Sequence, residues 1–153
     1  MEYAIEIIPF REQYRQETMQ LMQQINDEFS LPPHHPDYRP IEPDYYWLAL
    51  ADGKVVGSVA LQLGNSYAIL KRMFLKKAFR GKEVGISARL LQVAIQQCKQ
   101  SKMLRLYLGT LDVLIAAQKF YERNGFIRVE QEHLPQGFHH NLSDNLFYTI
   151  TID

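Results

Sequence analysis

The segment from residue 70 to residue 91, LKRMFLKKAFRGKEVGISARLL, combines cations and glycines at the start of an expected helix. Residues 71 to 82 contain six cations, which are Lys71, Arg72, Lys76, Lys77, Arg80 and Lys82. Gly81 and Gly85 lie in the turn that leads into the helix. The first N–H groups of a helix lack intrahelical acceptors and lie at the positive end of its dipole, so they attract anions. The turn is therefore either a solvated connection or an anion site.

Known phosphate motifs do not explain this turn. The Gly-Lys-Ser/Thr ending of a P-loop is absent, and so is the G-x-G-x-x-G pattern of dinucleotide-binding folds. Lys+Arg and Asp+Glu both total 17, so the net charge does not point to nucleic acid. The cation cluster is too small for a duplex footprint. We therefore predict no nucleic-acid partner, and a nucleic-acid-binding α/β domain remains an alternative.

The cysteine and the histidines offer little further chemistry. Cys98 is the single cysteine and falls on the apolar stripe of an expected helix, so we interpret it as a core residue and not as a nucleophile. His34-His35 and His139-His140 are adjacent pairs whose side chains project differently. No cysteine or acidic residue accompanies them at metal-ligand spacing. We predict no metal site.

Hydrophobic periodicity predicts the elements that position these residues. Strands are expected over residues 3–9, 45–51, 54–63, 67–75, 104–108, 126–133 and 145–152, and helices over residues 12–29, 85–100 and 111–123. Asp52-Gly53 predicts a hairpin, and Asn124-Gly125 predicts the end of the last helix. Four prolines place a loop between residues 30 and 43.

This element order predicts one α/β domain over residues 1–153, with a mixed sheet between layers of helices. The length of 153 residues suits one compact domain with its own core. No signal-peptide pattern begins the sequence, and no apolar run is long enough to span a membrane. We expect a soluble, cytoplasmic protein without a membrane partner.

Three motifs in this order resemble the GNAT superfamily of acyl-CoA-dependent N-acetyltransferases. RMFLKKAFRGKEVGISARLL resembles the strand, pyrophosphate loop and helix of that family, and LYLGT resembles its splayed strand. AAQKFYERNGF resembles its terminal helix, which ends in Tyr-x-x-x-Gly-Phe. The resemblance covers nearly the whole chain in element order. It implies a GNAT-type three-layer fold: a mixed, mainly antiparallel central sheet flanked by helices, with a splayed parallel strand pair at the cofactor site.

The resemblance also implies acetyl-CoA as co-substrate and no metal. Backbone groups of Met73, Phe74 and Leu75 would then hold the pantetheine arm and polarise the acetyl carbonyl. The pyrophosphate would lie against the turn and the helix start, at Arg80, Gly81, Lys82, Glu83, Val84, Gly85 and Ile86.

The chain departs from the family pattern at three positions. Glu83 stands where a glycine is usual, and its carboxylate would have to point away from the pyrophosphate. Leu114 replaces an asparagine that contacts the cofactor in many relatives. Gly109 lies where some relatives place a carboxylate base, so the usual base assignment is unavailable.

Two residues are candidate catalytic groups by this resemblance. Tyr121 corresponds to the tyrosine that protonates the departing CoA thiolate, although its spacing alone also suits a packing residue. Glu28, in NDEFSLPP, is the best candidate base because its helix borders the acceptor site in the family. A solvated helix carboxylate is the other interpretation. His133 and the pair His139-His140 are alternative bases.

These features predict transfer of an acetyl group from acetyl-CoA to a primary amine by direct attack, without an acyl-enzyme. The amine would belong to an unidentified small molecule or peptide, and residues 30–46 and 133–145 would form the walls of its site. The alternative function is a non-catalytic GNAT-like module that binds acyl-CoA as a sensor or scaffold. A homodimer is possible.

Overall fold

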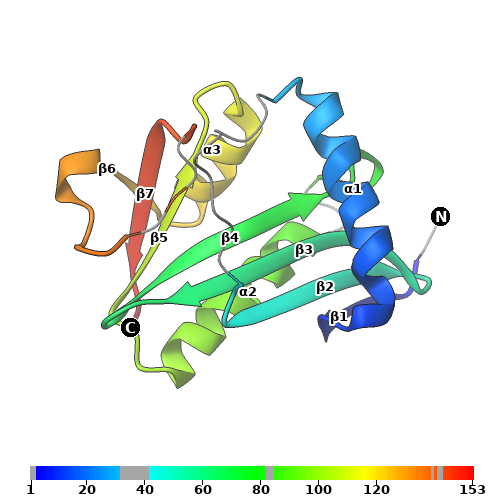
Figure 1. The fold of residues 1–153 in the computed structure, drawn as a ribbon, viewed down its shortest axis with the longest axis horizontal. Helices are drawn as coiled ribbons and strands as arrows, with labels where there is room; N and C mark the ends of the chain where they lie inside the picture. Colours follow the sequence, from blue (N-terminus) through cyan, green and yellow to red (C-terminus); the bar gives the residue numbers. More distant parts are fainter. Residues whose placement is uncertain (1–2, 32–41, 82–84, 139, 141–142) are drawn as a thin grey trace.

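The computed structural model describes residues 3–31, 42–81, 85–138, 140 and 143–153. Within these residues, seven strands form one sheet in the order β1-β2-β3-β4-β5-β7-β6 (Figure 1). The strands are β1 (Ile5–Pro9), β2 (Tyr45–Ala51), β3 (Lys54–Leu63), β4 (Tyr67–Leu75), β5 (Arg105–Thr110), β6 (Ile127–Val129) and β7 (Leu146–Thr151). The α-helices are α1 (Arg15–Glu28), α2 (Ile86–Gln100) and α3 (Ile115–Arg123).

Helices α1 and α2 cover opposite faces of the sheet (Figure 1). Alternation along β2 shows why, since successive side chains of a strand point to opposite faces. Leu48 and Leu50 are buried in one core with Leu21 of α1. Ala49 and Ala51 are buried in the larger core, which contains the apolar stripe of α2. The predicted three-layer architecture is confirmed.

Strands β4 and β5 form the parallel pair that the splayed-strand motif predicts. They pair only where Tyr67–Ile69 of β4 lies beside Arg105–Tyr107 of β5. Beyond these residues β4 continues to Leu75 and β5 to Thr110 without further pairing, and the two strands diverge toward α3 (Figure 1). The sheet therefore opens at the carboxyl ends of β4 and β5, which we call the splay.

Strand β7 separates the two strands that flank α3. It pairs antiparallel with β5 on one side and with β6 on the other. Strands β5 and β6 therefore run parallel but are not neighbours, which the sequence pattern did not show. The predicted strand over residues 126–133 is too long, because only Ile127–Val129 pairs with β7 and a 3₁₀ turn, η3 (Gln131–His133), follows.

Helix α3 begins later than the predicted residue 111. The N–H of Asp112 donates to Oδ1 of Asn145 (2.8 Å), and the N–H of Leu114 donates to the carbonyl of Leu111 (3.1 Å). These contacts form a separate turn before the helix. The first helical residue is therefore Ile115.

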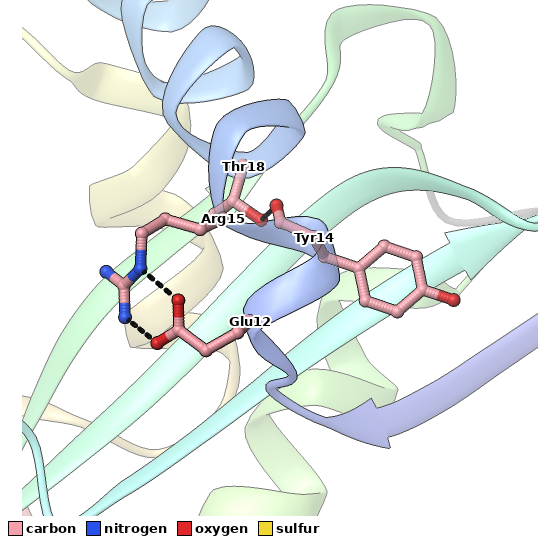
Figure 2. A network of polar contacts seen from close by, with 4 residues as sticks. All are labelled: Glu12, Tyr14, Arg15 and Thr18. Atoms are coloured by element: carbon pink, nitrogen blue, oxygen red, sulfur yellow. Dashed lines mark hydrogen bonds and ion pairs between the residues drawn. The ribbon is translucent and has the colours of Figure 1, made fainter.

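The predicted helix over residues 12–29 is divided into a 3₁₀ turn, η1 (Glu12–Tyr14), and α1. The guanidinium of Arg15 donates to both carboxylate oxygens of Glu12, and the hydroxyl of Thr18 donates to the carbonyl of Tyr14 (2.8 Å; Figure 2). The same guanidinium lies 4.9 Å from the ring centre of Phe10. These contacts hold the start of α1, whose N-cap residue makes no side-chain capping bond.

Candidate functional site

A cleft with a volume of about 640 Å³ opens at the splay, between the end of α1, the end of β4, the start of α2 and one side of α3. Its walls are mainly apolar with a few cationic and polar groups, as in most small-molecule sites. The lining residues are Ile25, Phe29, Leu31, Met73, Phe74, Leu75, Arg80, Gly81, Gly85, Ser87, Ala88, Leu114, Ala116, Ala117, Phe120, Tyr121, Arg123 and Asn124.

Residues from distant motifs meet in this cleft. The residues predicted to bind the cofactor that line it are Met73, Phe74, Leu75, Arg80, Gly81 and Gly85, and Tyr121 lies on the facing wall. Ile86 is fully buried and does not line the cleft. Lys82, Glu83 and Val84 lie outside the described residues, and the direction of the Glu83 side chain stays open.

The start of α2 exposes backbone donors to the cleft. Gly85 is the N-cap residue and has a φ of 68°, in the left-handed region that glycine adopts without strain. Its carbonyl accepts the N–H of Arg89 (3.1 Å). Among the described residues, no side chain caps the N–H groups of residues 86 to 88. Those of Ser87 and Ala88, which line the cleft, can therefore receive an anion.

Arg80 is held against the cleft wall by two partners. Its Nε–H donates to the carbonyl of Leu75 (2.8 Å), and its terminal nitrogens donate to the two carboxylate oxygens of Glu28 (2.6 and 2.8 Å). Its guanidinium also lies 5.1 Å from the ring centre of Phe29. A guanidinium has five N–H groups and the described residues accept from three of them, so two remain for a ligand. The Arg80 guanidinium is thus held in a fixed position and still has N–H groups that can donate to a ligand.

The ion pair changes the interpretation of Glu28. Its hydrogen bonds with Arg80 lower the pKa of the carboxyl group, which makes the carboxylate a weaker proton acceptor. The assignment of Glu28 as the base stays a prediction, and this pairing argues against it. A role in positioning Arg80 fits the geometry better.

The Glu28–Arg80 pair predicts a pH-dependent contribution to stability. Because the folded-state pKa of Glu28 is lowered, the contribution is present above the unfolded pKa of about 4.3 and disappears as the pH falls through the folded value. The side chains are 25% and 32% exposed, so solvent screening limits the effect. Glu28→Gln should lower the free energy of unfolding by about 0.5–1 kcal/mol at pH 7. Urea unfolding at pH 7 and pH 3.5 measures it.

Glu12→Gln is the matched control, because Glu12 forms the same two-bond contact with Arg15 but is 76% exposed. Its effect on stability should be smaller than that of Glu28→Gln. Equal losses in the two variants, or a Glu28→Gln loss that is undiminished at pH 3.5, would contradict the assignment.

Tyr121 is 7% exposed and packs in an aromatic cluster on α3. Its ring centre lies 5.6 Å from those of Phe120 and Phe126 and 6.1 Å from that of Tyr148. Burial raises the pKa of its hydroxyl, and the charge of Asp144 raises it further. The hydroxyl therefore stays protonated at neutral pH. Within the described residues it makes no hydrogen bond to protein, so it can donate to a ligand in the cleft.

Asp144 is a carboxylate at the splay that the sequence analysis missed. A Cβ atom on Gly109 would lie 2.5 Å from its Oδ2, so the carboxylate occupies the space beside this glycine. The next residue, Asn145, donates its N–H to the carbonyl of Thr110 (3.0 Å) and accepts from the N–H of Asp112. Asp144 belongs to none of the three motifs, and it lies in the segment 133–145 that was predicted to form a wall of the acceptor site without being singled out there.

The family model of the acetyltransferase (GNAT) family matches residues 8–126 of this chain. The chain belongs to the GNAT family. A crystal structure of a GNAT acetyltransferase from Staphylococcus aureus Mu50 superimposes with a TM-score of 0.88 at 30% identity, covering 98% of this chain and all of that one. The Thermoplasma acidophilum PaiA N-acetyltransferase, solved with coenzyme A, has the same fold (TM-score 0.75, 16% identity, 97% and 99% coverage).

Curated GNAT relatives include the N-acetylaspartate synthetase of Xenopus tropicalis. It is 36% identical over 110 residues, which are 69% of this chain and 40% of that protein. The chain thus spans about two-fifths of the length of this relative. The family and fold expected from the sequence are confirmed.

Other chemistry-bearing residues of this GNAT domain lie apart from the cleft or are inert. Cys98 is fully buried, and burial raises the pKa of its thiol to about 11, which confirms its assignment to the core. His133 ends η3, and the ring of His140 lies 5.0 Å from that of Phe147. His139 lies outside the described residues. Across the described ranges no cluster of three or more His, Cys, Asp or Glu side chains could hold a metal ion.

A second hollow of about 560 Å³ lies where β1 ends and β2 begins. Phe10, Arg15, Tyr46 and Arg72 are among its lining residues, and the Arg72 guanidinium lies 5.0 Å from the ring centre of Tyr46. It shares no lining residue with the cleft at the splay.

In the part of the chain that the structure describes, no helix has the length and apolarity needed to cross a bilayer.

Proposed function

We propose that this GNAT domain transfers an acetyl group from acetyl-CoA to a primary amine by direct attack. The observation that carries the proposal is the cleft at the splay, which is lined by the start of α2 with its uncapped backbone donors, by the fixed cation of Arg80 and by Tyr121. The groups that line the cleft match the parts of acetyl-CoA, because one end of the cleft suits an anion and its apolar walls suit an aliphatic arm. Family membership supports the same cofactor.

The residues that would hold acetyl-CoA follow from their positions in the cleft. The N–H groups at the start of α2 and the free N–H groups of Arg80 suit a pyrophosphate. The backbone of Met73, Phe74 and Leu75 at the open edge of β4 suits an extended pantetheine arm. When bound, the cofactor supplies an acetyl group activated as a thioester.

Tyr121 would act as the proton donor to the leaving sulfur. A protonated hydroxyl that is buried in the cleft wall can donate a hydrogen bond to sulfur as negative charge develops there. The raised pKa of Tyr121 keeps this donor protonated but disfavours complete proton release. We therefore propose that the proton moves only as the carbon–sulfur bond breaks.

The acceptor is proposed from the relatives. Several are N-acetylaspartate synthetases, so a small amine that carries carboxylate groups is the first class to test, with L-aspartate as its probe. A peptide amine is the second class. Cytoplasmic location and a homodimer stay predictions.

Calorimetric titration with acetyl-CoA tests cofactor binding, and thiol release measured over L-aspartate, other amino acids and small amines tests turnover. We expect micromolar binding and turnover of at least one amine. No binding at millimolar acetyl-CoA would contradict the proposal. Binding without turnover of any amine would favour the sensor or scaffold function instead.

The start of α2 provides a sharper binding test. Gly85→Val places a β-branched residue at a φ of 68° and should weaken acetyl-CoA binding at least 10-fold by distorting the donor groups. Gly53→Val is the matched control, because Gly53 also has a left-handed φ (81°), with open space around it, in the β2–β3 hairpin, and does not line the cleft. Equal acetyl-CoA affinity in the two variants would contradict the assigned pyrophosphate site.

A further inference from the structure

We propose that Asp144 receives the ammonium group of the acceptor at the splay and accepts its proton. This inference rests on the proposed acetyl transfer and adds a residue that binds the acceptor. It begins from the glycine at position 109. The absent side chain of Gly109 leaves room on β5 that the Asp144 carboxylate fills, with Oδ2 2.5 Å from the position of a Cβ atom.

The strand pattern places this carboxylate on one particular face of the splay. Leu108 is buried in the core shared with α2, so the neighbouring Gly109 faces the other side of the sheet. Tyr121 belongs to the α2-side core. Asp144 and Tyr121 therefore approach the splay from opposite faces, one available to an incoming amine and the other to a leaving sulfur.

The segment that carries Asp144 is held in place by hydrogen bonds of the next residue. Asn145, the residue after it, is bonded to Thr110 at the end of β5 and to Asp112 in the turn before α3. A carboxylate that recognises an acceptor needs such support, because small displacements strongly reduce the efficiency of a reaction.

Charged and titratable groups from three elements surround this carboxylate. Lys71 of β4 follows Leu70, which points into the α2-side core, so Lys71 shares the Gly109 face. Burial lowers the pKa of Lys71, and the negative charge of Asp144 counteracts this shift. Tyr121 of α3 also feels the charge of Asp144. His140 lies beside Phe147, whose ring approaches Gly109. The opposite charges of Asp144 and Lys71, which interact electrostatically, suit an acceptor that carries both an ammonium and a carboxylate.

The proton and electron balance of the step is complete with these residues. The ammonium gives one proton to the Asp144 carboxylate, and the nitrogen lone pair forms a bond to the acetyl carbon. The carbon–sulfur bond breaks and its electron pair stays on sulfur. The second nitrogen proton replaces the one that Tyr121 donates to sulfur. Asp144 then releases its proton to solvent.

The test compares Asp144→Asn, Asp144→Glu and Gly109→Ala by thiol release with L-aspartate and with the most reactive amine of the screen. We expect kcat/KM for the amine to fall about 100-fold in Asp144→Asn and less in Asp144→Glu. Gly109→Ala keeps the carboxylate but displaces it, and should lose activity similarly. Gly109 has no left-handed φ, so backbone strain does not explain such a loss.

Two readouts separate this role from a structural one. The acetyl-CoA dissociation constant should stay within twofold of that of the wild type in all three variants. Hydroxylamine is neutral at pH 7, so its reaction, corrected for the uncatalysed rate, should fall less than fivefold in Asp144→Asn. Asp153→Asn, an exposed carboxylate, is the control and should match the wild type.

The outcomes distinguish this inference from the proposed function. Wild-type turnover of an amine together with unchanged kcat/KM in Asp144→Asn would overturn the role of Asp144 and leave the acetyl transfer intact. An equal loss with hydroxylamine would also overturn it. Absence of wild-type turnover with every amine would overturn both the role of Asp144 and the proposed acetyl transfer.

NMR titration of the Lys71 ammonium adds a readout that does not depend on turnover. An unchanged Lys71 pKa in Asp144→Asn would contradict the placement of Asp144 near Lys71.

Discussion

Tyr121→Phe should lower kcat about 100-fold while the acetyl-CoA dissociation constant changes less than threefold. The substitution removes one hydroxyl and keeps the ring that packs against Phe120, Phe126 and Tyr148. The hydroxyl would act only when negative charge develops on sulfur, so its loss affects the transition state more than the bound ground state. Steady-state thiol release and calorimetry measure the two effects.

The pH dependence follows from the direction of the Tyr121 pKa. Because burial raises this pKa above its ordinary value near 10, the donor stays protonated through neutral and mildly alkaline pH. The wild type should therefore lose no activity from Tyr121 ionisation below about pH 10. An alkaline decline below that pH that is absent in Tyr121→Phe would contradict the assignment.

Tyr148→Phe is the control for this substitution. Tyr148 is fully buried in the same aromatic cluster, but its hydroxyl donates to a carboxylate oxygen of Glu122 (2.8 Å). Its loss should lower stability and leave kcat within about threefold of the wild-type value. Unchanged kcat in Tyr121→Phe, or equal losses of kcat in both variants, would remove Tyr121 from the mechanism.

Leu90→Ala should lower the free energy of unfolding by about 2–5 kcal/mol. Leu90 is fully buried on α2, and its Cδ1 lies 3.3 Å from where a Cβ atom on Gly57 would be, so helix and sheet meet here without space to spare. Truncation leaves a cavity between α2 and β3 in addition to the lost transfer energy. For a domain of this size the melting temperature should fall by about 5–15 °C.

Val113→Ala is the control, since Val113 is 66% exposed and should change stability by less than about 0.5 kcal/mol. Acetyl-CoA at 100 times its dissociation constant should raise the stability of a folded variant by about 2.7 kcal/mol if it binds only the folded state. Thermal melts with and without acetyl-CoA measure both effects. A Leu90→Ala loss below 0.5 kcal/mol would contradict this description of the core.

Local patterns were sufficient for much of the fold. Strands β2, β3 and β4 begin and end where apolar alternation and the Asp52-Gly53 turn place them, because both signals depend on residues adjacent in the sequence. Helix α2 begins directly after Gly85 for the same reason. The cofactor-binding assignments came from motifs of this local kind, and Met73, Phe74, Leu75, Arg80, Gly81 and Gly85 line one cleft.

Contacts between distant segments decided the rest. The later start of α3 depends on Asn145, and the shortness of β6 depends on how far it pairs with β7. The pairing of Glu28 with Arg80 joins residues 52 positions apart, and it converts a candidate base into an anchored partner of a cation. Each of these contacts requires the folded sheet, and no short-range pattern encodes it.

The sequence alone determined the family, the layered α/β fold and the segments that surround the cofactor site, since these follow from hydrophobic period, turn residues and helix-start chemistry. Only the tertiary structure placed a carboxylate from position 144 beside the glycine at position 109. The physical reason is spatial: an absent side chain on β5 makes room that another segment fills. The spacing of residues in the sequence shows neither the space beside Gly109 nor the Asp144 carboxylate that fills it.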